Sequence, residues 1–292
     1  MLNLITKQKY SIGVDIGASH ISCGLYNRDL KILDDKLYKY NKMNKSEEIS
    51  CSTNKFIKEI INLIDKLIMQ NNIDLKDVSS IGLGCPGGID KSEGIFFGST
   101  SLNVCQIDWR KELKKYNVNV YVENDCTCAG ICEHFMNNWE KFIMFTLGSG
   151  LGISYMIKNK CIDENVWDIA EINKKNGDKH DKYIKSFESL SKKYNSVKNE
   201  NYERGAIFEC IKKQDNEALG ILKEYIQNFI QGIIKIENKY KIGKYSIGGG
   251  MSEYSEFFIK EIQNKLPNII IKVAKYKNDS GIIGGALLEQ FC

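Results

Sequence analysis

The chain has 292 residues, enough for two compact domains, because single hydrophobic cores stop growing near about 250–300 residues. Its 42% apolar and 27% charged content excludes a disordered or collagen-like chain. Lys and Arg number 41 against 37 Asp and Glu, and they are scattered rather than gathered into a basic block, so nucleic acid is not an expected partner.

The first part of the chain predicts a three-stranded meander, a long helix and a further strand. Apolar or alternating patterns over residues 9–16, 19–27 and 30–40 are typical of strands. Residues 46–72 carry apolar side chains at helical spacing, which predicts one long helix. The apolar run 78–85 then predicts a strand that ends in a Pro-Gly-Gly turn.

The rest of the chain repeats this order of elements. A strand over 118–123 and a helix over 125–139 are followed by a hairpin over 142–159. Residues 160–200 are polar and lysine-rich, and we interpret them as a surface insertion with one helix near 182–195. Further helices are predicted over 202–213, 216–239 and 280–292, and further strands over 245–250 and 269–274. The pattern predicts an α/β fold with an internal duplication.

Domain boundaries follow from this repetition. We expect an N-terminal lobe over residues 1–118, with the C-terminal helix 280–292 packing back on it, and a second lobe over 119–279. Such a plan places an interlobe cleft between two similar halves.

The ten cysteines are dispersed along a proline-poor sequence without a signal peptide, so we expect reduced thiols in a cytoplasmic protein. No run of about 18 apolar residues is present, so a membrane location is not expected. Cys126 and Cys128 lie two residues apart in a predicted helix and point to different faces, which favours packing over a shared metal or a disulfide. His20, His134 and His180 are far apart in sequence, and none is assigned to a metal.

Three glycine turns follow predicted strands. Backbone amides at such turns form concavities suited to phosphate oxygens, although glycine at a hairpin usually serves a positive φ. Asp15 in the first turn can hold Mg²⁺ through water, so together the turns favour a nucleotide site. They read Asp15-Ile16-Gly17-Ala18-Ser19, Leu147-Gly148-Ser149-Gly150-Leu151-Gly152 and Gly248-Gly249-Gly250.

Asp125 follows the predicted strand that ends in YVEN and begins the next helix. A carboxylate at a strand end that faces phosphates can act as the general base for an acceptor hydroxyl. An aspartate at this place can equally be an N-cap without any chemistry. The residue pattern by itself leaves both roles open.

The order of these motifs resembles that of the ROK family of bacterial sugar kinases and related repressors, within the actin-like, ribonuclease H-like ATPase superfamily. The resemblance covers nearly the whole chain. No helix-turn-helix precedes the first strand, which favours a kinase-type member. The motifs are IGVDIGASH, GLGCPGGID, SLNVCQIDW, VENDCTCAG, TLGSGLGIS, SIGGGMSE and SGIIGGALL.

The resemblance implies a role for each matching position. Asp125 matches the catalytic base, and Asn103, Asn124 and Glu171 match positions that hold sugar hydroxyls. ATP and Mg²⁺ are the implied cofactors. The Mg-phosphate loop would comprise Asp15, Gly17, Ala18 and Ser19, its second half Gly148, Ser149 and Gly150, and the adenosine side Gly248, Gly249 and Gly250.

One segment departs from the family pattern. Family members carry a Gly-Glu-x-Gly-His segment, a cysteine cluster that binds structural zinc, and a second sugar-binding glutamate. Here Lys174 replaces the histidine, and no cysteine lies between Cys161 and Cys210, so zinc is not expected. Lys185 falls at the second glutamate when Phe187 and Ser189 set the register, and Glu188 is the alternative.

The resemblance therefore implies ATP-dependent phosphorylation of a hexose or amino-sugar hydroxyl. The altered segment implies a shifted acceptor or relaxed selectivity, because groups that would read one end of the hexose are missing. Lys174 and Lys175 are either solvated surface charges or favour an anionic acceptor. The alternative is a sugar- or nucleotide-sensing protein without catalysis. Many relatives are dimers, so a homodimer is one assembly that the resemblance implies.

Overall fold

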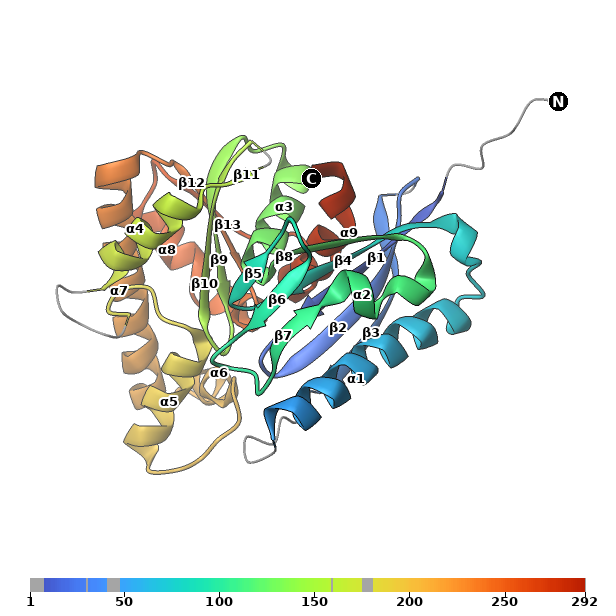
Figure 1. Cartoon of the computed structure of the whole chain (residues 1–292). Helices are drawn as coiled ribbons and strands as arrows, with labels where there is room; N and C mark the ends of the chain where they lie inside the picture. Colours follow the sequence, from blue (N-terminus) through green and yellow to red (C-terminus); the bar gives the residue numbers. More distant parts are fainter. Residues whose placement is uncertain (1–7, 30, 41–47, 159, 175–180, 292) are drawn as a thin grey trace. The chain divides into compact units, whose positions relative to one another are not determined.

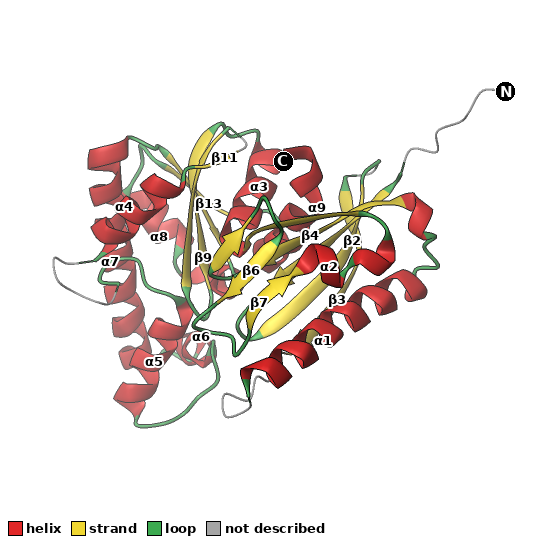
Figure 2. Cartoon of the chain, viewed as in Figure 1, coloured by secondary structure: helices red, strands yellow, loops and turns green. Residues whose placement is uncertain are grey.

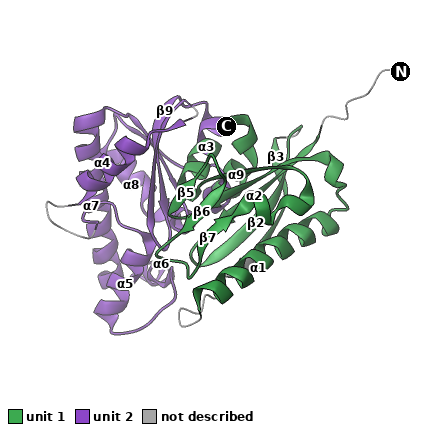
Figure 3. Ribbon diagram, in the orientation of Figure 1, with its two compact units in different colours: residues 1–132, 281–292 green, residues 133–280 purple. Residues whose placement is uncertain are grey.

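The computed structural model describes residues 8–29, 31–40, 48–158, 160–174 and 181–291 (Figure 1). Lys175 and His180, which the sequence singles out, lie outside the described residues. The chain forms two compact units, residues 1–132 with 281–292, and residues 133–280 (Figure 3). The first unit extends beyond the expected residue 118, because strand β8 (Asn119–Asn124) pairs with β4 (Val78–Cys85).

The sheet of the first unit has the strand order β3-β2-β1-β4-β8. The first three strands form an antiparallel meander, and β4 and β8 are added in parallel. The long helix α1 (Ile49–Gln70) buries Phe56, Ile60, Ile64 and Leu67 at helical spacing, so one apolar face of it packs into the core of this unit. The meander comprises β1 (Tyr10–Ile16), β2 (His20–Asn27) and β3 (Ile32–Tyr40).

A separate three-stranded sheet follows β4 in the first unit, with the order β5-β6-β7. Its strands have only three or four residues each, too short to show a periodic pattern in the sequence. Lys91, which follows β5, forms an ion pair with Glu123 of β8 at 2.8 Å. The elements here are β5 (Gly88–Asp90), β6 (Ile95–Gly98), β7 (Cys105–Asp108) and the short helix α2 (Trp109–Glu112).

The sheet of the second unit repeats the order of the first, as β11-β10-β9-β12-β13. Strands β9, β10 and β11 are antiparallel, and β12 and β13 are added in parallel. This repetition confirms the predicted duplication and α/β class. The strands are β9 (Lys141–Leu147), β10 (Leu151–Ile157), β11 (Lys160–Cys161), β12 (Lys244–Gly248) and β13 (Ile270–Val273).

Helices α4, α5 and α7 lie on one side of this second sheet (Figure 2). Glu133 ties the sheet to helix α3: its carboxylate accepts hydrogen bonds from the Ser246 hydroxyl at 2.8 Å and from the backbone N–H of Lys275 at 3.0 Å. The α-helices that follow α1 and α2 in the chain are α3 (Asp125–Asn137), α4 (Asp163–Asn173), α5 (Phe187–Lys198), α6 (Ala206–Lys212), α7 (Asn216–Tyr240), α8 (Ile259–Lys265) and α9 (Ser280–Phe291). Four 3₁₀ helices complete the described elements: Leu75–Asp77, Lys114–Tyr116, Gly250–Phe257 and Lys277–Asp279.

The prediction of a surface insertion over 160–200 is wrong. This segment contains two helices, α4 and α5, and both contribute side chains to the core of the second unit. Ile169 of α4 and Leu190 and Tyr194 of α5 are buried. Helix α4 buries only Ile169 and Asn173 and leaves Trp167 exposed, so its apolar positions show no clear helical period in the sequence.

No helix among the described residues has both the length and the apolar character needed to cross a membrane. The nine cysteines within the described ranges form no disulfide with one another. Cys126 and Cys128 are buried, which confirms their packing role.

Candidate active site

The candidate site of the first unit is built on the carboxyl ends of three parallel strands. Asp15 of β1 is level with Gly84 of β4, and Gly84 is level with Glu123 of β8. Because neighbouring strands are about 4.8 Å apart, the ends of β1 and β8 lie roughly 10 Å from each other. Asp15 and the helix that begins at Asp125 therefore meet the same edge of the sheet.

Asn124, rather than Asp125, caps helix α3. Its side-chain oxygen accepts hydrogen bonds from the backbone N–H groups of Cys126 at 3.1 Å and Thr127 at 3.3 Å, which satisfies the free donors of the first turn. Asp125 is the first helical residue, and its Oδ1 accepts a hydrogen bond from the N–H of Cys126 at 2.8 Å. The capping explanation for Asp125 is therefore wrong, because its neighbour serves that purpose.

The environment of Asp125 suits a general base. Burial raises the pKa of its carboxyl above the usual aspartate range, although the backbone N–H groups of Cys126 and of Asp125 itself act in the opposite direction. Part of the Asp125 side chain remains exposed at the surface, so a substrate hydroxyl can reach it. A carboxylate with a raised pKa accepts a proton more readily than an ordinary one.

Glu123, the other acid of the same motif, has a different role. It is buried, it forms the ion pair with Lys91, and its Oε1 accepts a hydrogen bond from the backbone N–H of Asn124 at 2.7 Å. Glu123 thus fixes the end of β8 just before the capping residue.

Helix α9 lies directly on this end of the sheet and against α3. A Cβ atom added to Gly281 would lie 2.6 Å from the Cγ atom of Asp15, so the first turn of α9 adjoins that carboxyl. A Cβ atom at Gly284 would overlap the carbonyl of Cys128 in α3. Glycine at position 284 therefore permits an approach of two helices that any larger residue would prevent.

The turn after β1 is tight. The backbone N–H of Gly17 donates to the carbonyl oxygen of His20 at 2.9 Å, and the Ser19 hydroxyl lies 3.2 Å from Nδ1 of His20. Of the four residues expected to form the Mg-phosphate loop, Gly17, Ala18 and Ser19 make up the β1–β2 connection, and Asp15 lies near the end of β1. The Asp15 carboxyl at a strand end, beside this turn, fits the oxygen donors that Mg²⁺ prefers.

The two glycine turns of the second unit lie side by side, because Gly248 of β12 is level with Thr146 of β9. Gly249 has φ +76°, and a Cβ atom there would lie 2.8 Å from the backbone nitrogen of Leu147. By contrast, a Cβ atom added at Gly148 or Gly150 meets no described atom within 4 Å. The backbone of the Gly148–Gly150 turn is therefore open to a ligand.

The sugar-reading positions are less clearly assembled. Asn103 lies on the connection between β6 and β7 of the first unit. Glu171 has 73% of its side chain exposed and pairs with Nζ of Lys174 at 3.4 Å. Glu188, the alternative for the second glutamate, accepts a hydrogen bond from Nε of Arg204 at 3.1 Å. The roles predicted for Asn103 and Glu171 stay predictions.

Within the described ranges, no three His, Cys, Asp or Glu side chains are grouped so that they could hold a metal ion. Nδ1 of His134 lies 2.8 Å from the carbonyl oxygen of Trp139, so this histidine contacts the segment between α3 and β9. Sequence reasoning missed the capping role of Asn124 and the buried Glu133. An Asn before a helix was a usable signal for the first, whereas nothing in the pattern marks the second.

Comparison with known proteins agrees with this architecture. A model of the ROK family matches residues 11–165. The chain is 22% identical over 316 residues to the N-acetyl-D-glucosamine kinase of Haemophilus influenzae, which covers 94% of this chain and 98% of that protein. It is 30% identical over 163 residues to the xylose repressor of Bacillus subtilis, covering 54% of this chain and 40% of the repressor.

A solved structure shows the same fold. The ROK family glucokinase from Streptomyces griseus in complex with glucose and AMPPNP matches 96% of this chain and 98% of its own, with a TM-score of 0.73 and 17% identity. The family model covers more than half of the chain and spans both Asp15 and Asp125. The chain belongs to the ROK family and has its actin-like ATPase fold.

Proposed function

We propose that this protein is a sugar kinase that transfers the γ-phosphoryl group of ATP to a hydroxyl of a hexose or amino sugar. The observation that carries the proposal is the position of Asp125, a half-buried carboxylate of raised pKa that does not cap its helix and shares a sheet edge with Asp15. A protein that only binds a sugar has no need of such a base. The kinases among the relatives support the same conclusion.

In this proposal Asp125 accepts the proton of the acceptor hydroxyl as its oxygen bonds to the γ-phosphorus. The bond from that phosphorus to the β–γ bridging oxygen breaks, and ADP leaves. Mg²⁺ bound through water at Asp15 would neutralise part of the negative charge of the phosphates. The remaining residues position the reactants. The sugar is held by Asn103, Asn124 and Glu171. The phosphates are held by Gly17, Ala18, Ser19, Gly148, Ser149 and Gly150, and the adenosine by Gly248, Gly249 and Gly250.

Asn124 enters this proposal with part of its side chain already engaged. Its oxygen accepts the two capping hydrogen bonds, so its amide NH₂ group is the part assigned to a sugar hydroxyl. The same side chain would thereby fix both the helix that carries the base and the substrate.

The test is ADP release from ATP and Mg²⁺ with a panel of hexoses, amino sugars and N-acetylated amino sugars. The proposal expects release that depends on one sugar or on a small group of them. Release at the same slow rate with and without every sugar, in protein that binds ATP, would contradict it.

A second function has its own support. Lysines at positions 174 and 185 replace residues that would read a neutral hexose, and a xylose repressor is among the relatives. A sugar- or nucleotide-sensing protein without catalysis would bind a sugar in equilibrium measurements yet release no ADP in the assay above. Binding and ADP release measured on the same preparation separate the two functions.

A further inference from the structure

An ion pair joins the small three-stranded sheet of the first unit to the strand that ends beside Asp125. Nζ of Lys91, in the turn between β5 and β6, lies 2.8 Å from Oε2 of Glu123 in β8. Only 9% of the Glu123 side chain is exposed, against 46% for Lys91. A carboxylate so far removed from water needs a cation or hydrogen-bond donors beside it, because an uncompensated buried charge is costly.

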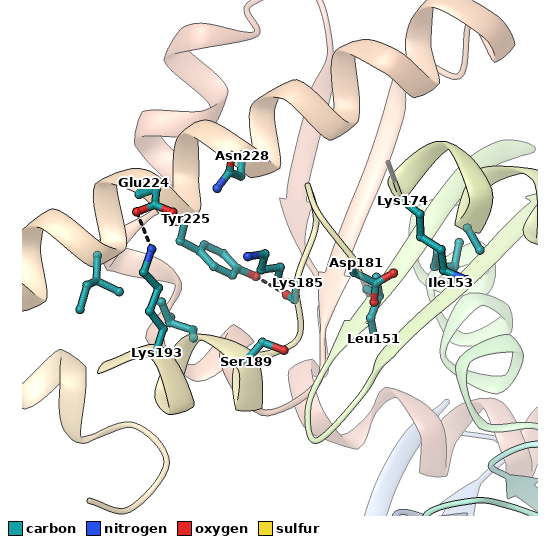
Figure 4. Close-up of a pocket in the computed structure, with 13 residues that line it drawn as sticks. Leu151, Ile153, Lys174, Asp181, Lys185, Ser189, Lys193, Glu224, Tyr225 and Asn228 are labelled. Atoms are coloured by element: carbon teal, nitrogen blue, oxygen red, sulfur yellow. Dashed lines mark hydrogen bonds and ion pairs between the residues drawn. The ribbon is translucent and has the colours of Figure 1, made fainter. Parts of the chain in front are cut away.

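Ion pairs between exposed side chains differ from this one. The Lys193–Glu224 pair in Figure 4 has side chains that are 42% and 54% exposed, so water screens it and its loss should have little effect. These two residues line a cavity of about 510 Å³ in the second unit. The same cavity contains Lys174 and Lys185, which stand at sugar-reading positions of the family pattern, so it is part of the proposed sugar site.

Glu123 holds the residue that precedes the proposed base. Its Oε1 accepts a hydrogen bond from the backbone N–H of Asn124 at 2.7 Å. The Asn124 side chain in turn accepts from the N–H groups of Cys126 at 3.1 Å and Thr127 at 3.3 Å, which closes the first turn of α3. A displacement of the Glu123 carboxylate would therefore move both the capping amide and the Asp125 carboxyl.

The turn that carries Lys91 is held by several hydrogen bonds. Oδ1 of Asp90 accepts from the N–H groups of Ser92 at 2.9 Å and Glu93 at 3.1 Å. The Arg110 guanidinium donates to the carbonyl oxygens of Ser92 and, at 3.4 Å, of Lys91. Because these bonds fix its backbone, Lys91 presents its ammonium group to the buried carboxylate from a rigid support, which lowers the entropy lost in forming the pair.

We propose that Lys91 is a positioning residue for the phosphoryl transfer and acts through Glu123 on the start of α3. Lys91 needs no contact with a reactant for this role, because it keeps in place the carboxylate that fixes Asn124. A displacement of about 1 Å near a reacting group can lower turnover by about 10²-fold. The kinetic consequence rests on the proposed kinase function, whereas a looser first turn of α3 can be measured without any activity.

Lys91→Met tests the pair, because methionine keeps an unbranched apolar stem and removes the charge. At saturating sugar and ATP, kcat should fall by about 10–100-fold, since the base is displaced. The KM for ATP should change by less than about twofold, because the glycine turns are untouched. Lys91→Arg keeps the positive charge and should restore most of the turnover. A kcat for Lys91→Met within about twofold of wild type would overturn the proposal.

Lys76→Met is the matched control. Lys76 also forms an ion pair at 2.8 Å, with Asp74, but both of these side chains are mostly exposed. Loss of this pair should leave kcat and KM unchanged. An equal fall of kcat in the two variants would mean that the effect is not specific to the buried pair, and Lys91 would lose its assigned role.

A second substitution tests whether Lys91 acts through Glu123. Glu123→Gln removes the buried charge, and its amide oxygen can still accept from the N–H of Asn124. In Lys91→Met/Glu123→Gln no unpaired charge is left in the pair, so kcat should recover by about tenfold relative to Lys91→Met alone. A double variant no faster than Lys91→Met would mean that Lys91 acts by another route, contrary to the proposal.

Amide hydrogen exchange of the segment 120–130 gives a readout that does not depend on activity. In Lys91→Met the N–H groups of Asn124, Cys126 and Thr127 should exchange faster than in the wild type, while helix α1 of the same unit keeps its rate. Unchanged exchange in this segment, or an equal increase in α1, contradicts the proposal. Faster exchange in a protein whose wild type shows no sugar-dependent turnover would instead end the kinase proposal and leave the contact between Lys91 and α3 established.

Discussion

The two five-stranded sheets have the same strand order, yet their carboxyl edges carry different chemistry. In the first unit the edge bears carboxylates, Asp15 near the end of β1 and Asp125 directly after β8. In the second unit the corresponding edge bears two bare glycine turns, Gly148–Gly150 after β9 and Gly248–Gly250 after β12. Duplication of a topology therefore supplied two similar edges, and the side chains placed on each decide what it can do.

The two edges also differ in how closely helices approach them. The first is packed by α9, whose glycines contact β1, β4 and α3 at distances that exclude a side chain. At the second edge, the positions of Gly148 and Gly150 are open. A close-packed edge holds the acidic groups in fixed places, whereas an open one leaves its backbone accessible to a ligand.

The largest expected effect comes from removing a carboxylate from the edge of the first sheet, and it is an effect on catalysis. Asp125→Asn keeps the size of the side chain and removes the base, so sugar-dependent turnover should fall by about 10²–10⁴-fold or more. ATP affinity, measured by titration, should stay close to that of the wild type, because the glycine turns are untouched.

Asp29→Asn, a change of the same type on the exposed β2–β3 turn, is the control and should leave turnover unaltered. Turnover of Asp125→Asn within a few-fold of wild type would remove Asp125 from the mechanism.

The next effect is on stability and tests the close packing of the acidic edge. Gly284→Ala places a methyl group on the carbonyl of Cys128, so α9 must move away from α3 at a cost of about 1–3 kcal/mol. Urea unfolding should show a lower midpoint.

Gly220→Ala is the matched control, because Gly220 lies in α7 with open space around it. Alanine there should raise stability by about 0.5–1 kcal/mol, since glycine is the poorer helix former. Equal effects of the two substitutions would mean that the α9–α3 contact is not tight.

Much of the duplicated fold could be predicted because its central strands are long and apolar. Strands β1, β4 and β9 are buried along most of their length, and their patterns stand out from the flanking turns. The three-stranded sheet after β4 and helix α4 could not be predicted in the same way. The strands are too short, and α4 buries little more than Ile169 and Asn173, so neither gives a clear period.

The candidate site, like the fold, could be predicted from the sequence only in part. The glycine turns and the two aspartates could be located from their order along the chain. The role of Asp125 could not be resolved from the sequence, because Asn124 and Asp125 are both good capping residues and only the hydrogen bonds of the first helical turn distinguish them. The pairing of Glu171 with Lys174 depends on a helix that the sequence does not indicate.

A smaller effect tests the open edge of the second unit. In Gly148→Ala the added Cβ atom would meet no neighbour within 4 Å, and the backbone φ of residue 148 is not positive. The free energy of unfolding should therefore be unchanged or slightly higher. If this turn holds ATP phosphates, the methyl group should disturb a hydrogen bond and raise the KM for ATP by about two- to tenfold. Steady-state kinetics at saturating sugar measures this, with Gly220→Ala as the control. An unchanged KM would mean that ATP does not approach the turn.

The smallest effect concerns pH and the acidic edge itself. Burial raises the pKa of Asp125 in the folded protein above its unfolded value. Its contribution to stability is therefore fully present below the unfolded pKa and is lost as the pH rises through the folded pKa. Asp125→Asn removes the ionisable group. The melting temperature of the variant minus that of the wild type should therefore be larger at pH 7.5 than at pH 4. Differential scanning calorimetry at both pH values measures the difference, and the exposed Asp29→Asn should show none. A difference of the opposite sign would mean that the folded protein stabilises the Asp125 carboxylate, and the argument that its burial makes it a stronger base would fail.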